Sequence, residues 1–251
     1  MGYMSKDETT GLKALMRTMF FSAETIERFM SSATTGQARA LVGLIEDEAE
    51  VRERRKRERL MRKAKFPQIK SFNDYDFSEV ALPGGYTVDA LRSLEFMDAA
   101  QDFVFHGQTG RGKTHLAIAI GVAAVSKGRE VRFFTAAELV MALTKAYGDD
   151  SLDRFTKDIS KCELLIVDEL GYVPLAQAGA RLLFQVLSDC YERRSLLITT
   201  NIEFSKWGVV FGDDKMASAI IDRVMHHGRL IEFNGSSKRM EHALMLGRVS
   251  V

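Results

Sequence analysis

The stretch that decides the fold is Gly107-Gln-Thr-Gly-Arg-Gly-Lys113-Thr114, which follows the short apolar run Phe103-Val-Phe-His106. It matches the spacing G-x-x-x-x-G-K-[ST] in full and is placed between a predicted strand and a predicted helix. Its glycines allow backbone angles that turn amide N–H groups toward a phosphate, and the helix N-terminus adds a positive dipole end. The residues expected to bind the nucleotide here are Gly107, Gln108, Thr109, Gly110, Arg111, Gly112, Lys113, Thr114 and His115.

Two acidic residues form the second half of the predicted site. Asp168 and Glu169 close the apolar run that starts at Leu164, and the carboxyl ends of buried strands are where open α/β sheets bind ligands. Lys113 is expected to reach the β- and γ-phosphates of ATP, while Thr114 and Asp168 hold Mg²⁺. Glu169 is expected to polarise the attacking water. A carboxylate beside the aspartate that holds Mg²⁺ favours hydrolysis over phosphoryl transfer to another substrate. The alternative for Glu169 is a solvated residue at a strand end.

Two further polar residues stand at the ends of predicted elements. Asn201 ends the run SLLITTN, where its amide would contact the γ-phosphate and the water. The alternative is an ordinary turn former at a strand end. Arg223 leaves the apolar face of a helix near its C-terminus. Spacing alone favours a surface arginine there, and the alternative is an arginine finger supplied to a neighbour's ATP.

Alternating elements predict the fold class. The predicted strands are 103–106, 130–135, 163–169, 195–201 and 229–234, and the predicted helices between or beside them include 88–98, 113–127, 177–193 and 214–227. This alternation indicates an α/β domain whose parallel sheet lies between helices on both faces.

The chain is predicted to have three parts. Residues 1–65 form a small all-helical N-terminal domain for a partner or DNA, with a break at 31–36, because an amphipathic stripe precedes a long polar helix. Pro67 ends that helix, and the turn-rich, aromatic segment 66–86 is a linker that packs on the following domain. Residues 87–251 form the ATPase domain.

Five runs of residues together resemble the IstB-type ATP-binding proteins, which are helper ATPases encoded beside the transposase in one group of bacterial insertion sequences. The runs are GQTGRGKTHLAIAI, DELGYVPL, LLITTN, AIIDRVMHHG and AKFPQIKSFNDYDF. The DnaC-type helicase loaders are close relatives of that family, and both belong to the AAA+ ATPases. The resemblance therefore implies a P-loop AAA+ domain that hydrolyses ATP with Mg²⁺.

The resemblance also implies roles for single residues. It implies that Lys113 is the Walker A lysine and that Thr114 is the metal ligand beside it. Asp168 would be the Walker B aspartate and Glu169 the catalytic base. Asn201 would be sensor 1, and Arg223 would be an arginine finger acting in trans. A finger in trans implies a homo-oligomer with ATP sites at subunit interfaces. The family's Gly-x-Ser-Tyr-Arg is replaced by Gly-Ser-Ser-Lys-Arg, so Arg239 is a candidate sensor-2-like contact that lacks the preceding tyrosine.

The formal net charge of +1 hides a strongly basic helix. Residues 52–65 contain nine basic and two acidic residues, a net charge of +7, which leaves −6 for the rest of the chain. Arg52, Arg55, Arg59 and Arg62 fall on one helical face, and such a stripe can follow the phosphates of duplex DNA. The alternative is that this helix is only exposed to solvent and binds no DNA, as is expected of the acidic run EDEAE that precedes it.

The composition of the chain limits the possible functions further. The two cysteines, Cys162 and Cys190, are too few for a disulfide framework and are predicted to be core residues. The N-terminal residues contain no apolar stretch like that of a signal peptide, and the longest apolar run is about half of a bilayer span, so a cytoplasmic protein without membrane contact is expected. The leading hypothesis is an ATPase that assembles on DNA and assists a transposase. The alternatives are a loader of the replicative helicase, a small-molecule kinase and a binding module without hydrolysis.

Overall fold

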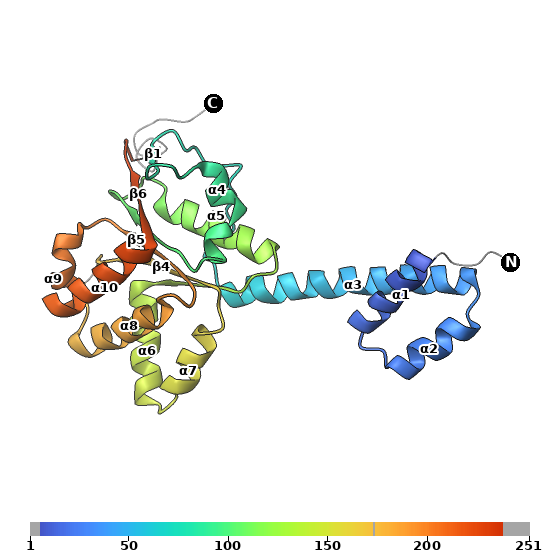
Figure 1. Cartoon of the computed structure of the whole chain (residues 1–251). Coiled ribbons are helices and arrows are strands. Elements are labelled where there is room, and N and C mark those ends of the chain that lie inside the picture. Colours follow the sequence, from blue (N-terminus) through green and yellow to red (C-terminus); the bar gives the residue numbers. More distant parts are fainter. Residues whose placement is uncertain (1–5, 173, 238–251) are drawn as a thin grey trace. The chain divides into compact units, whose positions relative to one another are not determined.

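The computed structural model describes residues 6–172 and 174–237 (Figure 1). The candidate sensor-2 residue, Arg239, lies outside the described residues. The chain divides into two compact units, Met1–Glu58 and Arg59–Val251. Among the helices of the described residues, none has both the length and the apolar character that crossing a membrane requires.

The first unit is helical. It consists of helix α1 (Lys6–Thr18), helix α2 (Ala23–Ser32) and the first part of helix α3 (Thr35–Ala64). Its small core is formed by Leu12, Met16, Ile26, Ala38 and Ile45.

The break predicted at 31–36 is present as the short gap between α2 and α3. The helical region is also interrupted earlier, between α1 and α2. There Phe20 takes a left-handed conformation with φ 63°, and the Ser22 side chain accepts a hydrogen bond from the Thr25 N–H as the N-cap of α2. The amphipathic first helix therefore ends at Thr18, before this turn.

A six-stranded, mostly parallel sheet forms the centre of the second unit, in the order β1-β6-β2-β5-β4-β3. Its strands are β1 (Val80–Ala81), β2 (Asp102–His106), β3 (Val131–Thr135), β4 (Leu164–Leu170), β5 (Ser195–Thr200) and β6 (Gly228–Phe233). The five longer strands are parallel, and the short edge strand β1 pairs antiparallel with β6. Each of the five predicted strands begins and ends within one residue of its prediction.

Helices cover both faces of this sheet, as predicted. They are α4 (Val88–Ser93), α5 (Lys113–Ser126), α6 (Ala136–Gly148), α7 (Leu152–Ile159), α8 (Gln177–Cys190), α9 (Trp207–Phe211) and α10 (Asp214–His227), with the 3₁₀ turns η1 (Glu95–Met97) and η2 (Phe204–Lys206). The helix predicted over 88–98 stops at Leu94, which has a φ of 66° and starts the turn η1.

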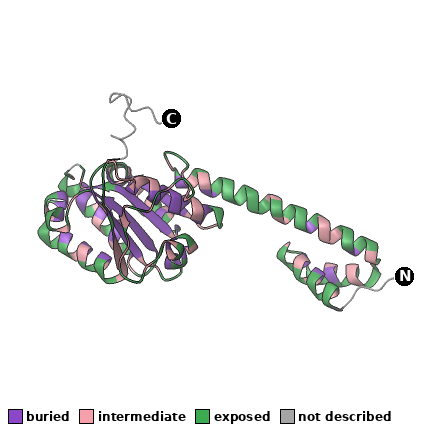
Figure 2. Ribbon diagram, turned by 90° about the horizontal axis from the view of Figure 1, so that it is seen from above, coloured by how far each residue is buried: buried purple, intermediate pink, exposed green. Residues whose placement is uncertain are grey.

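The strands send alternate side chains into two cores, because successive residues of a strand point to opposite faces. In β4, Leu164 and Ile166 join the core beneath α4 and α5, while Leu165 and Val167 join the core beneath α6, α8, α9 and α10 (Figure 1). Figure 2 shows that the strands are the most completely buried part of this unit. The buried parallel sheet explains why the strands read as continuous apolar runs.

The last residues of α3 belong to the second unit. Leu60 and Ala64 are buried in the core that also contains α4 and α5, and α3 ends where Lys65 takes a φ of 60°. Lys63 Nζ lies 2.6 Å from Glu130 Oε1 and 3.0 Å from Asp158 Oδ1. The hydrogen bond to Glu130 raises the pKa of Lys63. One of the nine positive charges in the basic segment is thus paired inside the protein.

Both cysteines are core residues, as predicted. Cys162 is 3% exposed and Cys190 is 1% exposed. Burial raises the pKa of Cys162 to about 11 and raises that of Cys190 further above its ordinary value. Both side chains therefore stay protonated thiols at neutral pH.

Asp102, the first residue of β2, is an ionisable group buried in the second unit. Its side chain is only 3% exposed, and Oδ1 accepts a 2.8 Å hydrogen bond from the Leu196 N–H. Burial raises its pKa to about 7, while the Leu196 hydrogen bond and the nearby His227 act in the opposite direction. Below about pH 7 the folded protein therefore favours the neutral carboxylic acid. The unfolded chain favours the carboxylate above about pH 4.

We expect Asp102→Asn to remove a pH-dependent cost. Because the pKa in the folded state is raised, the contribution of Asp102 to stability is full below about pH 4 and is lost as the pH rises to about 7. The free energy of unfolding of the variant, relative to the wild type, should therefore rise over this interval by up to about 4 kcal/mol. Urea unfolding at pH 4.5, 6 and 8 measures the difference, and a difference that does not change with pH would contradict it.

Candidate active site

The phosphate-binding loop joins β2 to α5 at the carboxyl edge of the sheet. Gly107, Gly110 and Gly112 have φ values of 151°, 87° and 88°, which side chains rarely allow. Gly112 is the N-cap of α5, so the loop delivers its backbone to the N-terminus of a helix. These are the features by which a backbone surrounds a phosphate group.

Lys113, the first residue of α5, reaches back over this loop. Its ammonium Nζ donates to the Gly107 carbonyl at 2.6 Å and to the Gln108 carbonyl at 2.8 Å. The residue is 9% exposed, so the charge is held mostly out of bulk water. The loop thus carries a fixed cation at the place where phosphates are expected.

Asp168 is the point at which three elements meet. The Thr114 hydroxyl of α5 lies 3.0 Å from both carboxylate oxygens of Asp168 in β4. The Thr199 hydroxyl of β5 donates a short hydrogen bond to Asp168 Oδ1. Thr114 and Asp168, which are predicted to hold Mg²⁺, therefore lie in contact. Thr199 was not among the residues predicted for this site.

Glu169 is placed by an irregularity of the sheet. The pairing of β4 with β5 shifts between Val167 and Leu170, so that Asp168 and Glu169 form a bulge opposite Thr199. Glu169 has a φ of 60°, and its N–H donates to the Thr199 hydroxyl at 2.9 Å. The Glu169 side chain is exposed at the cavity described next, which is where a base for water activation is required.

A cavity of about 610 Å³ opens beside the loop, within the usual range for small-molecule sites. Its lining includes the predicted residues Thr109, Gly110, Arg111, Gly112, Lys113, Thr114, His115, Glu169 and Asn201. The sequence did not indicate the remaining lining residues, which are Pro67, Gln68, Lys70, Ile118, Tyr172, Thr199 and Thr200. Pro67, Gln68 and Lys70 belong to the predicted linker, so this segment forms one wall of the site.

The same linker supports the loop through an aromatic contact. The rings of Tyr75 and His115 are 5.2 Å apart in an edge-to-face arrangement. Burial lowers the pKa of His115, and its Nε2 is buried without a hydrogen-bond partner. Burial likewise raises the pKa of Tyr75, whose hydroxyl lies close to Gly112. Both rings are therefore uncharged at neutral pH and pack against the loop.

Three other predicted residues have contacts of their own. Arg111 donates to the Phe233 carbonyl and to Gln108 Oε1, both at 3.0 Å, so it ties the loop to β6. Asn201 directly follows β5 and lines the cavity. Arg223, in α10, donates a hydrogen bond to Ser188 and lies over the Phe184 ring. It is not among the lining residues of the cavity of its own chain.

The predicted DNA-binding residues are all helical and exposed. Arg52 and Arg55 belong to the first unit, and Arg59 and Arg62 belong to the second. Arg52 Nε forms an ion pair with Glu48 Oε1 at 2.7 Å, one turn earlier in α3. Ion pairs this exposed contribute little to stability.

The oxygen ligands at the site suit Mg²⁺. The ion prefers one or two protein oxygens together with substrate phosphates and water, and the Thr114 hydroxyl and Asp168 carboxylate supply such atoms. Within residues 6–172 and 174–237, no cluster of three or more His, Cys, Asp and Glu residues could hold a metal ion by itself. A bound metal would therefore need the nucleotide as a further ligand.

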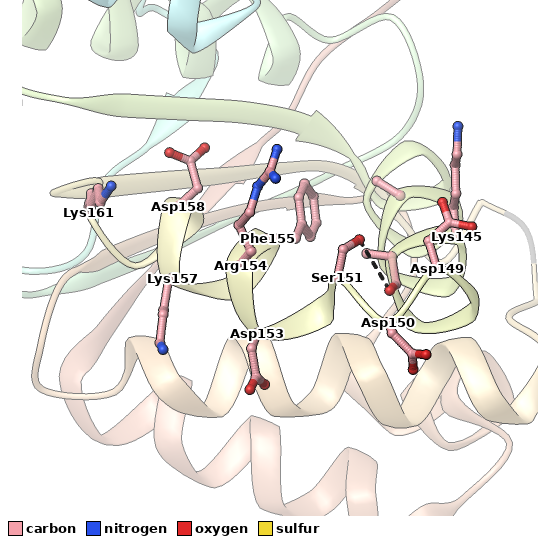
Figure 3. A pocket seen from close by; sticks show the side chains of 12 residues that line it. Lys145, Asp149, Asp150, Ser151, Asp153, Arg154, Phe155, Lys157, Asp158 and Lys161 are labelled. Atoms are coloured by element: carbon pink, nitrogen blue, oxygen red, sulfur yellow. Dashed lines mark hydrogen bonds between the residues drawn. The ribbon is translucent and has the colours of Figure 1, made fainter.

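A second cavity, of about 1120 Å³, lies along α6 and α7 (Figure 3). Basic and acidic side chains alternate around it, and they include Lys145, Asp153, Arg154 and Lys157. None of the residues predicted from the sequence lines it, and its mixed charges favour no ligand of one sign.

The glycine-rich loop, the lysine that follows it and the carboxylates at the end of β4, placed at the edge of a parallel sheet, are the features of a P-loop nucleotide-binding domain. The chain belongs to the family of IstB-like ATP binding proteins, whose profile matches residues 10–245. It is 37% identical over 201 residues to the ATP-binding protein of insertion sequence IS232 from Bacillus thuringiensis subsp. berliner, covering 80% of each chain. It is 32% identical to the corresponding protein of IS5376 from Geobacillus stearothermophilus, covering 84% of each.

Solved structures show the same fold. AMPPCP-bound DnaA from Aquifex aeolicus superposes with a TM-score of 0.54 and 15% identity, over 74% of this chain and 57% of that one. A DnaA bound to AMPPCP and single-stranded DNA gives a TM-score of 0.51 and 17% identity, over 68% and 55%. The chain thus spans little more than half of the length of these structures.

We expect Gly112→Ala to damage the loop. A Cβ at this position would lie 2.8 Å from the Tyr75 hydroxyl, on a backbone with a φ of 88°. Such backbone strain costs about 1–3 kcal/mol, and relaxing it would turn the loop amides away from a phosphate. The affinity for a fluorescent ATP analogue and the melting temperature should both fall.

Gly148→Ala is the matched control, because an added Cβ would meet no atom within 4 Å at the end of α6. Its nucleotide affinity and melting temperature should match those of the wild type. Wild-type nucleotide binding by Gly112→Ala would show that the loop conformation is not required.

Proposed function

We propose that the protein is a cytoplasmic Mg²⁺-dependent ATPase that assembles as a homo-oligomer on duplex DNA and assists a transposase. The observation that carries the hydrolytic part is the contact of Thr114 with Asp168, with Glu169 beside it at the cavity. Lys113 would bind the β- and γ-phosphates, and bound Mg²⁺ would neutralise charge that develops on them. Glu169 would accept a proton from the attacking water, and the Asn201 amide would orient that water.

A carboxylate at this place also favours hydrolysis over the kinase alternative. A small-molecule kinase has to keep water away from the γ-phosphate, whereas exposed Glu169 would activate it. A binding module without hydrolysis would need neither Glu169 nor the bulge that presents it. These considerations support water as the acceptor.

The proposed oligomer rests on Arg223. This arginine lies outside the cavity lining of its own chain and is held on the surface of α8 by Ser188 and Phe184. If a neighbouring subunit drew the guanidinium away from these contacts, it would stabilise charge on the transferring phosphate there. Each subunit would then complete the active site of the next.

The partners are proposed from the family and from the basic helix. The relatives of IS232 and IS5376 are ATP-binding proteins of insertion sequences, which favours a transposase over the replicative helicase. Arg52, Arg55, Arg59 and Arg62 would contact DNA phosphates, because exposed arginines on one helical face match a phosphate backbone. Binding would be salt-sensitive and weakly sequence-specific.

Mixing two inactive variants tests hydrolysis and assembly together. Glu169→Gln and Arg223→Ala should each bind ATP like the wild type and lose turnover, by about 10³-fold for the arginine. In an equimolar mixture, Glu169→Gln subunits would lend Arg223 to neighbours that retain Glu169. About a quarter of the sites would then be complete if subunits mix at random in head-to-tail contacts. Phosphate release with duplex DNA measures the recovery.

An inactive mixture would exclude the role of Arg223 in trans if the two variants co-assemble by light scattering. Full turnover by Glu169→Gln alone would exclude the proposed catalytic base. The same light-scattering measurement, with and without duplex DNA, shows whether DNA drives assembly.

The arginine stripe predicts a change in salt dependence. Each phosphate contact contributes about 0.9 to the slope of log K against log salt concentration. The pairs Arg52→Ala/Arg55→Ala and Arg59→Ala/Arg62→Ala should therefore each lower the slope by about 2, measured by fluorescence anisotropy with a labelled duplex. Arg54→Ala/Arg57→Ala removes the same charge from the opposite helical face and should leave the slope unchanged. Equal effects from all pairs would contradict a defined stripe.

A further inference from the structure

Thr199 in β5 connects the two acidic residues of the site through one oxygen atom. The residue is 1% exposed. Its hydroxyl donates to Asp168 Oδ1 and accepts the Glu169 N–H at 2.9 Å. The neighbouring Thr200 also bonds to β4, but to the Leu170 carbonyl at 2.8 Å. Thr199 therefore differs from the next threonine in contacting the predicted metal ligand and the predicted base together.

Only a hydroxyl group can make this pair of contacts at that position. A hydroxyl supplies one donor and two acceptor lone pairs, so the same oxygen can give its proton to the carboxylate and receive the amide N–H. A methyl group in its place would lie against the carboxylate and leave the Glu169 N–H without this partner. Strands favour β-branched side chains, but valine would satisfy that preference equally well. The preference therefore does not explain the hydroxyl oxygen of Thr199.

The bulge gives the hydroxyl a structural task. Between Val167 and Leu170 the register of β4 against β5 shifts, so the Glu169 N–H bonds to a side chain of β5 instead of a strand carbonyl. Glu169 is held at a φ of 60°, which is uncommon for a residue with a side chain. Bulges of this kind redirect side chains next to active sites.

We propose that Thr199 is a positioning residue for the hydrolysis of ATP. It turns the Asp168 carboxylate toward Thr114, and it holds the Glu169 backbone in the conformation that presents the Glu169 carboxylate to the cavity. This inference rests on the proposed ATPase activity. It adds a residue that acts through Asp168 and Glu169, because its hydroxyl is engaged in contacts with both of them.

Thr199→Val should lower kcat by about 10- to 100-fold, the usual cost of removing a partner of a metal ligand. The KM for ATP should rise only by the factor by which the Mg²⁺-dependent part of binding is lost, because Lys113 and the loop glycines remain. A second readout needs no turnover: Mg²⁺ should strengthen the binding of a non-hydrolysable ATP analogue by less than in the wild type. Analogue affinity without Mg²⁺ should stay at the wild-type value.

Matched variants separate the hydroxyl from packing. Thr199→Ser keeps the oxygen and should restore both readouts to near wild-type values. Ser195→Ala removes a buried hydroxyl at the other end of the same strand and should alter neither readout. If Thr199→Val does not fold, as judged by circular dichroism, Thr199→Ala also removes the oxygen and introduces no methyl group beside the carboxylate.

Wild-type kcat and Mg²⁺ response in Thr199→Val or Thr199→Ala would overturn the inference, as would equal losses in Thr199→Ser. Glu169→Gln, measured in parallel, distinguishes this failure from that of the proposed function. Lost turnover in Glu169→Gln with full turnover in Thr199→Val overturns only the role of Thr199. Full turnover in Glu169→Gln overturns the proposed base, and the role of Thr199 in placing it is then overturned as well.

Discussion

The Asp168 carboxylate accepts hydrogen bonds from Thr114 and Thr199, and this interaction joins α5, β4 and β5 at the carboxyl edge of the sheet. Both core layers of the second unit serve to hold these elements in register, since β4 and β5 bury side chains on each face. The contacts also concentrate oxygen atoms where a hard cation and phosphates would bind. The proposed chemistry therefore depends on a few polar contacts at the rim of an otherwise apolar sheet.

The linker and the loop depend on each other in the same way. Pro67 and Gln68 line the cavity, and Tyr75 packs on His115 directly after the loop lysine and threonine. The order of the chain places these residues before β2, so a segment that looks like a connector completes the site. We therefore expect nucleotide affinity to depend on the linker as well as on the loop.

The loop and the strands could be predicted from the sequence because their signals are local. Contacts between residues that are distant in the chain could not be predicted. The loop from Gly107 to Thr114 has fixed spacing, and the strands are short apolar runs, so both could be located without a structure. Thr199 looked like any β-branched strand residue, because its partners depend on a bulge in β4. Lys63 contributes to the net charge of +7 of residues 52–65, and its ion pair could not be predicted because its partner Glu130 is 67 residues away.

The end of α3 also sets a limit on how far one wall of the cavity can move. Ala64 is anchored in the core, and only Lys65 and Phe66 separate it from Pro67 at the cavity. A fully extended chain covers at most about 3.6 Å per residue, so this tether reaches about 11 Å. Any separation of Pro67 from Ala64 beyond that reach would have to pull the last turn of α3 out of the core. Opening of this wall and release of the helix end are thus one event beyond that distance.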